Sequence, residues 1–390
     1  MGHAAMSEPA LVKKTTSLRV NNFDLIRLLA ATQVLISHLF MTFFDAPSAT
    51  DGGFGYFIFF VCINLPGVPI FFAISGYLIS LSWERSGSLG TYAHNRFLRL
   101  FPALWLCLIV TILVMLASGY LASVEFDVQD FLRWIFWQST IGQTYTIGML
   151  HGFGHGGAPN GALWSIPVEM QFYVALPLIY LVLPKKSPRL FIVGIALLVL
   201  VMAVVSEWLV GQDITTKWGF RLRVVTCLPY IYMFLLGVLI QRLRHQLMPL
   251  LRNMFIPWLA FYIGVASLLH FEYGWPLHVR LGSNNPPIFL AMILAMTTIS
   301  AAYTLPTLSK RILRGNDISY GVYIYHMVFI NLVLYLEIAG AALQAIIVVL
   351  ATYTAATLSW LFLERPSLSL KRHTLRTDGP TTAAKGTVGS

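Results

Sequence analysis

Arg27 and His38 are polar side chains inside the first apolar stretch of the chain, which runs from about residue 23 to residue 44. Ionisable groups at membrane depth are costly and are usually retained for function. Eleven helical steps of about 100° and about 1.5 Å place the two side chains on one helix face, about 16 Å apart. A guanidinium near a membrane surface can bind an anion, and an imidazole with a pKa of about 6.5 suits a general base. The pair suggests chemistry on a substrate that reaches into the membrane from one surface.

Further charged residues near the same surface strengthen the case for an anion site. Asp24 lies three residues before Arg27, so the two side chains can pair across one helical turn. Arg96 and Arg99 have the same spacing at the start of a later apolar stretch, which places both guanidiniums on one helix face. Planar guanidinium donors match phosphate oxygens, although such charges also serve simply to orient helices in a membrane. Arg27, Arg96 and Arg99 are therefore candidate ligands of an anionic cofactor.

The segment from Leu163 to Tyr173 contributes a carboxylate to an otherwise apolar stretch. Ser165, Glu169 and Tyr173 are spaced i, i+4 and i+8 and form a polar stripe directly after Trp164. A carboxylate in this position is either an interfacial charge or a functional group that faces the interior of the bundle, and the stripe favours the second interpretation. We expect Glu169 to orient an imidazole or a hydroxyl group of a substrate.

A second polar face is expected near the end of the chain. Ser319, Tyr323 and His326 share one side of a predicted helix by the same spacing argument. The sequence leaves two roles open for His326, because a buried histidine can pack and orient a neighbour as readily as it can catalyse a reaction.

The remaining histidines and cysteines do not indicate a metal site. His151 and His155 lie in a glycine-rich loop, but two histidines are too few ligands to predict zinc. Cys62, Cys107 and Cys227 lie in or near apolar stretches without CxxC spacing, as expected for packing residues. We therefore expect no bound metal.

The composition is that of a multi-pass membrane protein. The 390 residues are 57% hydrophobic and only 11% charged, and the mean hydropathy of +0.72 is far above that of a soluble domain. The net charge of +10 comes from short Lys and Arg clusters between apolar stretches. This pattern sets membrane orientation and argues against nucleic acid as a partner.

The chain is predicted to be an all-α, polytopic transmembrane helix bundle of about ten spans. The apolar stretches lie near 23–44, 56–82, 97–118, 164–183, 190–210, 224–241, 254–270, 287–305, 318–337 and 341–363. An eleventh stretch, 131–150, is ambiguous. If it crossed the membrane, the basic loops at 185–189, 242–252 and 310–314 would face outward. If it does not, these loops and the basic tail at 371–372 face the cytoplasm, and Lys217, Arg221 and Arg223 are left in an outer loop against the charge rule. We therefore expect a re-entrant or interfacial segment near 131–150.

These spans divide the chain into three parts. Residues 1–22 are predicted to be a cytoplasmic segment without a cleavable signal peptide, and residues 23–366 to be the membrane domain. Residues 367–390 are predicted to be a cytoplasmic, largely disordered tail. Both termini are then cytoplasmic.

Several motifs together resemble the acyltransferase 3 family of membrane enzymes, over nearly the whole chain from Asp24 to Pro366. The matching motifs are Asp24-x-x-Arg27-x10-His38, Phe71-Phe72-x-x-Ser75-Gly76-Tyr77-Leu78, Arg96-x-x-Arg99-Leu100-x-Pro102-x-x-Trp105, Leu163-Trp164-Ser165-x-x-x-Glu169-x-x-Phe172-Tyr173, Ser319-Tyr320-x-x-Tyr323-Ile324-x-His326 and Glu364-Arg365-Pro366. Their order and number carry the resemblance.

The resemblance implies an integral membrane O-acyltransferase of the bacterial inner membrane. Such enzymes move an acyl group, commonly acetyl, from cytoplasmic acyl-coenzyme A to a hydroxyl of a carbohydrate or glycolipid acceptor. It implies His38 and Glu169 as catalytic residues and Arg27, Arg96 and Arg99 as ligands of acyl-coenzyme A. The supporting residues would be Asp24, Ser75, Trp164, Ser165, Tyr173, Tyr323 and His326. Two alternatives remain open, namely acylation of a macrolide or other small molecule, and transport of a glycan or lipid.

Overall fold

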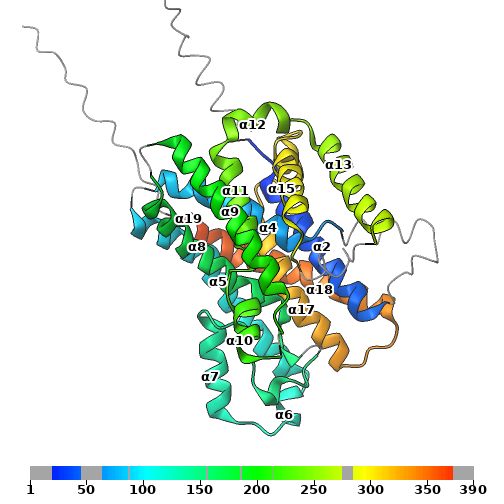
Figure 1. Ribbon diagram of the computed structural model, residues 1–390. Coiled ribbons are helices and arrows are strands. Elements are labelled where there is room, and N and C mark those ends of the chain that lie inside the picture. The colour runs from blue at the N-terminus through cyan, green and yellow to red at the C-terminus, as the bar shows by residue number, and fades with distance from the viewer. Residues whose placement is uncertain are drawn as a thin grey trace, which may run out of the picture.

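The computed structural model is helical in the residues that it describes, which are 20–44, 64–86, 88–154, 157–184, 187–213, 215–274 and 284–371 (Figure 1). No strand occurs in these ranges. Cys62 and His155, with most of the two terminal segments predicted above, lie outside them.

The predicted bundle is confirmed. Within the described ranges, seven helices, some with short 3-10 or π extensions, are long and apolar enough to cross a membrane, and three more are apolar but shorter. The ten helices are α2 (Phe23–Phe43), α4 (Gly67–Arg85), α5 (Leu89–Ala117), α8 (Ser165–Val182), α9 (Pro188–Val210), α11 (Ile231–Arg242), α13 (Phe255–Ser267), α15 (Ile288–Ala302), α17 (Ser319–Tyr335) and α18 (Ala341–Ser359).

Two helices begin later than the hydropathy suggested. α4 begins at Gly67, beside the middle of α2, where the Gly67 amide donates to the Gln33 side chain at 2.7 Å. α11 begins at Ile231, after a π-helical turn (η5, Arg221–Val225) and a turn that contains Pro229. Proline lacks the amide hydrogen that a continuous helix would need, so the apolar stretch becomes helical only beyond it.

The ambiguous segment near 131–150 does not cross the membrane. It forms α7 (Val128–Ser139), followed by a loop and the single turn η2 (Gly148–Leu150). Twelve residues rise only about 18 Å, well short of a hydrocarbon core of about 30 Å. Asp127 caps α7 by accepting from the amides of Gln129 and Asp130. Trp134 is buried against the protein while Leu132 and Phe136 are exposed, as expected of an interfacial helix.

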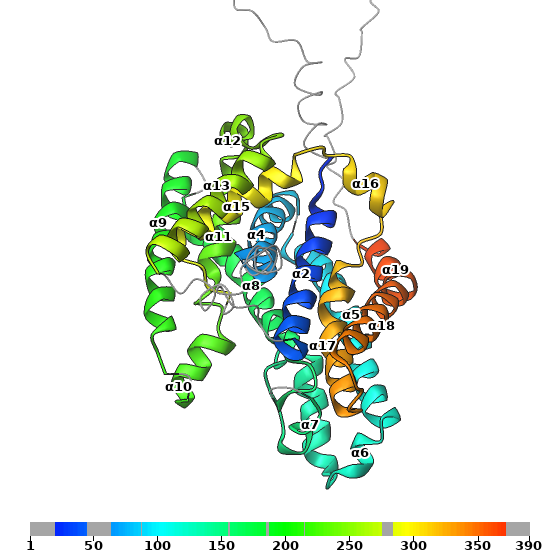
Figure 2. The ribbon, with the colours of Figure 1, turned by 90° about the vertical axis from the view of Figure 1, so that its right-hand side faces the viewer.

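Most of the basic connections lie at one end of the bundle, but the connection that contains α10 (Lys217–Phe220) is also basic, with Lys217, Arg221 and Arg223. α12 (Arg244–Leu251) and α16 (Leu308–Leu313) lie at the end of the bundle where α2 begins, whereas α6 (Tyr120–Ser123), α7 and α10 lie at the opposite end (Figure 2). Because α12 and α16 belong to the Arg- and Lys-rich connections, we call the first of these the basic end. This separation agrees with a segment 131–150 that does not cross.

Small residues bring α4 and α11 into direct backbone contact. A Cβ at Gly76 would collide with the carbonyl oxygen of Phe234, and a Cβ at Gly237 would collide with that of Ala73. Close packing through glycine is a common way to join helices in a membrane. The α4–α11 pair forms a tight seam on one side of the cavity described next.

Candidate active site

Five helices surround a cavity of about 70 Å³ that gathers most of the predicted site residues. Its polar lining comes from α2, α4, α5, α8 and α17, and consists of Arg27, Ser75, Arg96, Arg99, Ser165, Glu169, Tyr173, Ser319, Tyr320 and Tyr323. Apolar side chains such as Phe71, Phe72 and Leu78 fill the spaces between them. Residues more than 200 positions apart in the sequence therefore share one site.

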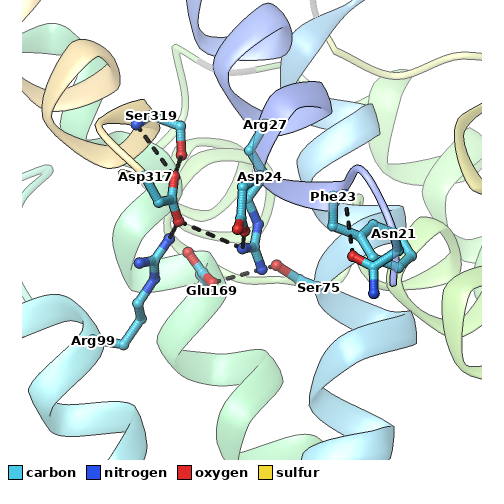
Figure 3. A network of polar contacts seen from close by, with 9 residues as sticks. All are labelled: Asn21, Phe23, Asp24, Arg27, Ser75, Arg99, Glu169, Asp317 and Ser319. Atoms are coloured by element: carbon cyan, nitrogen blue, oxygen red, sulfur yellow. Dashed lines mark hydrogen bonds and ion pairs between the residues drawn. The ribbon is translucent and has the colours of Figure 1, made fainter. Parts of the chain in front are cut away.

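Asp317 holds two of the three predicted arginines (Figure 3). Its carboxylate lies 2.7 Å from Nη2 of Arg99 and 3.6 Å from Nη1 of Arg27, and it accepts a hydrogen bond from the Ser319 hydroxyl. Arg27 also pairs with Asp24 at 3.2 Å, which confirms the predicted contact across one turn. Burial alone would raise the pKa of Asp317, but Arg99 and Arg27 lower it to about 2.

Asp317 was not among the residues predicted from the sequence. It lies in the connection between α16 and α17, two residues before Ser319, and so directly before a motif that was already recognised. An acidic residue there could have been suspected as a helix-start residue, since its carboxylate also accepts from the Ser319 amide. Its pairing with Arg99 joins positions 218 residues apart and carries no local signal.

Arg96 differs from the other two arginines because no carboxylate lies within ion-pair distance of it among the described residues. Nη2 donates to the Ser82 hydroxyl at 3.3 Å, and the guanidinium lies 5.6 Å from the centre of the Tyr173 ring. Its Nε is buried without a hydrogen-bond partner. Arg96 thus brings a positive charge and an unused donor to the cavity wall.

Lys371 adds to the positive potential near the arginines. It follows the short helix α19 (Arg365–Ser369), beyond the last span. Burial and the positive charges of Arg99 and Arg96 lower its pKa from 10.5 to about 8. Such a cluster favours a multiply charged anion over a neutral ligand.

Glu169 organises hydroxyl groups inside the cavity. Its Oε1 accepts from the Tyr173 hydroxyl at 2.7 Å and from the Ser75 hydroxyl at 3.3 Å. The predicted polar stripe does face the interior. Ser165 lies on the same face but bonds to the Tyr323 hydroxyl at 2.7 Å, and Tyr323 in turn donates to the Ala162 carbonyl.

Pro177 inside α8 has a consequence for this stripe. Because proline has no amide hydrogen, the carbonyl of Tyr173, four residues earlier, loses its helical partner. The Tyr92 hydroxyl on α5 replaces that partner, at 3.1 Å. The backbone that carries Glu169 and Tyr173 is therefore tied to the helix that carries Arg96 and Arg99.

His38 contacts His326 directly. Nδ1 of His38 lies 3.0 Å from Nε2 of His326, and the two rings stack with their centroids 5.0 Å apart. Neither imidazole lines the cavity, but Tyr323 does, and its ring meets that of His326 edge to face at 6.0 Å. The histidine pair therefore lies directly beyond the wall formed by Tyr323. The hydrogen bonds of Glu169 described above go to hydroxyls, and it is His326 that contacts the His38 imidazole.

Trp164, one of the predicted supporting residues, lies apart from the cavity lining. Trp164 packs against Tyr230, with ring centroids 5.1 Å apart, and supports the start of α8. Among the described residues, no group of three or more His, Cys, Asp or Glu side chains is arranged to hold a metal ion.

The fold and the site define a multi-pass helical membrane protein with an arginine cluster, a carboxylate and a histidine pair around one internal cavity. A model of the acyltransferase 3 family, described as an acyltransferase domain, matches residues 20–363, and the chain belongs to this family. It is an acyltransferase that transfers groups other than aminoacyl groups, and more narrowly a membrane O-acyltransferase.

Relatives of known name agree with this assignment. Nodulation protein 10 of Rhizobium leguminosarum bv. viciae is 30% identical over 365 residues, which cover 90% of this chain and 94% of that protein. Peptidoglycan O-acetyltransferase OatA of Listeria monocytogenes is 27% identical over 91% of this chain, but the match spans only 57% of OatA. An O-acetyl transferase of Shigella phage Sf6 is 34% identical over 40% of this chain and 44% of that protein. No solved structure matches the chain significantly.

Proposed function

We propose that the protein transfers an acyl group, most simply acetyl, from cytoplasmic acyl-coenzyme A to a hydroxyl of a carbohydrate acceptor in the bacterial inner membrane. The observation that carries the proposal is the cavity itself, which joins three guanidiniums to a carboxylate and ends beside the His38–His326 pair. The basic end and both termini would face the cytoplasm, following the charge rule. An exopolysaccharide, a lipopolysaccharide or a lipo-oligosaccharide would serve as acceptor. Membership of a family with relatives named as O-acetyltransferases supports this choice.

The arginine cluster would bind the phosphates of the donor. Arg96 has a donor group without a partner, so it would engage a phosphate without first breaking an ion pair. Arg27 and Arg99 would bind while Asp317 holds them in place. The pantetheine arm would then extend along the cavity and bring its thioester toward Tyr323 and the histidines.

His38 would act as the general base. It would take the proton of the acceptor hydroxyl while that oxygen attacks the thioester carbonyl. The carbon–sulfur bond then breaks, and the coenzyme A thiolate leaves and takes up a proton. Transfer through a transient acyl-histidine uses the same residues. Glu169, which already holds two hydroxyl groups, would orient the acceptor.

The test is acyl transfer by purified protein in lipid nanodiscs, with radiolabelled acetyl-coenzyme A and candidate glycan acceptors. His38→Ala should lower turnover by about 10² to 10⁴, while the exposed-histidine control His245→Ala keeps wild-type turnover. Full activity of a folded His38→Ala protein would refute the role of His38. Movement of a labelled glycan or lipid without consumption of acetyl-coenzyme A would identify a transporter instead, and acylation of a macrolide but no glycan would change the acceptor class.

A further inference from the structure

We propose that His326 determines which ring nitrogen of His38 carries the hydrogen, and thereby makes Nε2 of His38 the basic atom. His326 is then a positioning residue, because it acts on the acceptor only through His38. The inference rests on the proposed function of His38 as the base.

A chain of hydrogen bonds fixes the two tautomers. Nδ1 of His326 lies 3.3 Å from the carbonyl oxygen of Val322, one helical turn earlier in α17. A carbonyl can only accept, so this nitrogen must carry a hydrogen. A neutral imidazole has one N–H, so Nε2 of His326 carries a lone pair and accepts. The atom that it faces at 3.0 Å, Nδ1 of His38, must therefore be the donor.

The consequence for His38 follows from the same count. A neutral His38 with its hydrogen on Nδ1 carries its lone pair on Nε2. In free histidine the Nε2–H tautomer is the more populated one, and it would place a hydrogen where the reaction needs a lone pair. The contact with His326 reverses this preference.

Burial keeps His326 in the required neutral form. The side chain is 0% exposed, and no salt bridge found among the described residues involves it. A buried charge without a partner is expensive. If His326 were doubly protonated, its Nε2–H would donate to Nδ1 of His38, and the order of the hydrogen bonds would be reversed.

The same contact would help after proton transfer. When the proton of the acceptor hydroxyl arrives on Nε2, His38 becomes an imidazolium, and its Nδ1–H donates to Nε2 of His326. A hydrogen bond from a charged donor is stronger than one from a neutral donor. This is the logic of a catalytic triad, in which a third group orients the base and stabilises its charged form, except that the third group here is a neutral histidine.

Two variants at position 326 separate orientation from simple packing. In His326→Gln, the side-chain amide oxygen can replace Nε2 as the acceptor, whereas His326→Leu fills the space without one. We expect His326→Leu to lower kcat by about 100-fold, with the KM for acetyl-coenzyme A changed less than about twofold. His326→Gln should recover at least about tenfold of that loss.

A spectroscopic measurement tests the inference without relying on activity. In protein labelled with ¹⁵N-histidine, nitrogen chemical shifts distinguish protonated from unprotonated ring nitrogens. The His38 signals, assigned by their loss in His38→Ala, should show a protonated Nδ1 and an unprotonated Nε2. His326→Leu should shift them toward the opposite tautomer, and His245→Leu should leave them unchanged.

The outcomes are distinct. A protonated Nε2 on His38 in the wild-type protein overturns the inference. Equal losses of kcat in folded His326→Gln and His326→Leu also overturn it. If neither of these variants folds, the nitrogen chemical shifts of His38 in the wild-type protein determine whether the inference holds. If His38→Ala keeps full activity while the spectrum shows the expected tautomer, the proposed base is wrong and the hydrogen-bond order stands.

Discussion

Replacement of Asp317 by asparagine removes the one carboxylate that both Arg27 and Arg99 contact in the described structure. The side chain of Asp317 is only 8% exposed, and an asparagine in its place would keep its shape while removing its charge. The two guanidiniums would remain partly buried without the negative charge that now offsets their desolvation. Loss of one partner of a buried ion pair is strongly destabilising. We therefore expect Asp317→Asn to lower the free energy of unfolding well beyond the effect of a surface substitution.

Two routes give the magnitude of this loss. Lowering the pKa of Asp317 from 3.8 to about 2 corresponds to about 2 kcal/mol of stability at neutral pH. Breaking a buried pair by mutation typically costs about 3–5 kcal/mol. We expect a loss of about 2–4 kcal/mol for Asp317→Asn. The matched control is Asp130→Asn, which removes an exposed ion pair with Arg133 across one turn and should cost no more than about 1 kcal/mol.

The assay is denaturant unfolding in detergent micelles, followed through intrinsic tryptophan fluorescence, which needs no reactive thiolate and can be read across the whole pH range. Because the folded-state pKa of Asp317 lies below the ordinary value, its stabilisation is complete above about pH 4 and disappears as pH falls toward 2. The gap between wild type and Asp317→Asn should thus be constant from pH 8 to pH 5 and narrow below about pH 4. A gap no larger than that of Asp130→Asn, or one that widens in acid, would refute the reasoning.

Two further predictions concern the donor. Arg96→Ala should raise the KM for acetyl-coenzyme A by about 10- to 100-fold with a smaller change in kcat, because it removes a charge-assisted contact. Steady-state kinetics would measure both constants, with Arg133→Ala, at an exposed arginine on α7, as the control. An equal KM in the two variants would contradict this role of Arg96. Lys371, whose pKa is lowered to about 8, is charged below that pH and neutral above it, so the wild-type KM for acetyl-coenzyme A should rise as pH increases through 8. In Lys371→Ala that rise should be missing, and an identical KM profile would show that the Lys371 charge does not reach the donor.

The arrangement of spans could be predicted because it depends on local properties. Hydropathy identified the ten apolar helices of the described residues in order. The distribution of basic loops predicted that the segment 131–150 does not span the membrane, and its helix α7 is indeed too short to do so. Helix starts were less accurate. α4 begins at Gly67 and α11 at Ile231 for reasons that hydropathy does not record, a tertiary contact to Gln33 in one case and a proline in the other.

The site was predicted as a set of residues rather than as a set of contacts. Spacing placed Glu169 and Tyr173 on one face, and they do bond to each other, because both lie on the same helix. Contacts between helices could not be read in this way. The pairing of His38 with His326 spans 288 positions, and the pairing of Arg99 with Asp317 depends on how α5 and α17 pack.

The glycine seam between α4 and α11 also sets the position of a residue on a third helix. A Cβ at Gly76 would collide with the Phe234 carbonyl oxygen, and one at Gly237 would collide with that of Ala73, so alanine at either position would push the two helices apart. The Phe172 ring of α8 packs against Phe72 of α4 and Phe234 of α11, with centroids 5.0 and 4.7 Å away, so α8 rests on both sides of the seam. Widening the seam would therefore disturb the support of the helix that carries Glu169 and weaken its hydrogen bond to Ser75.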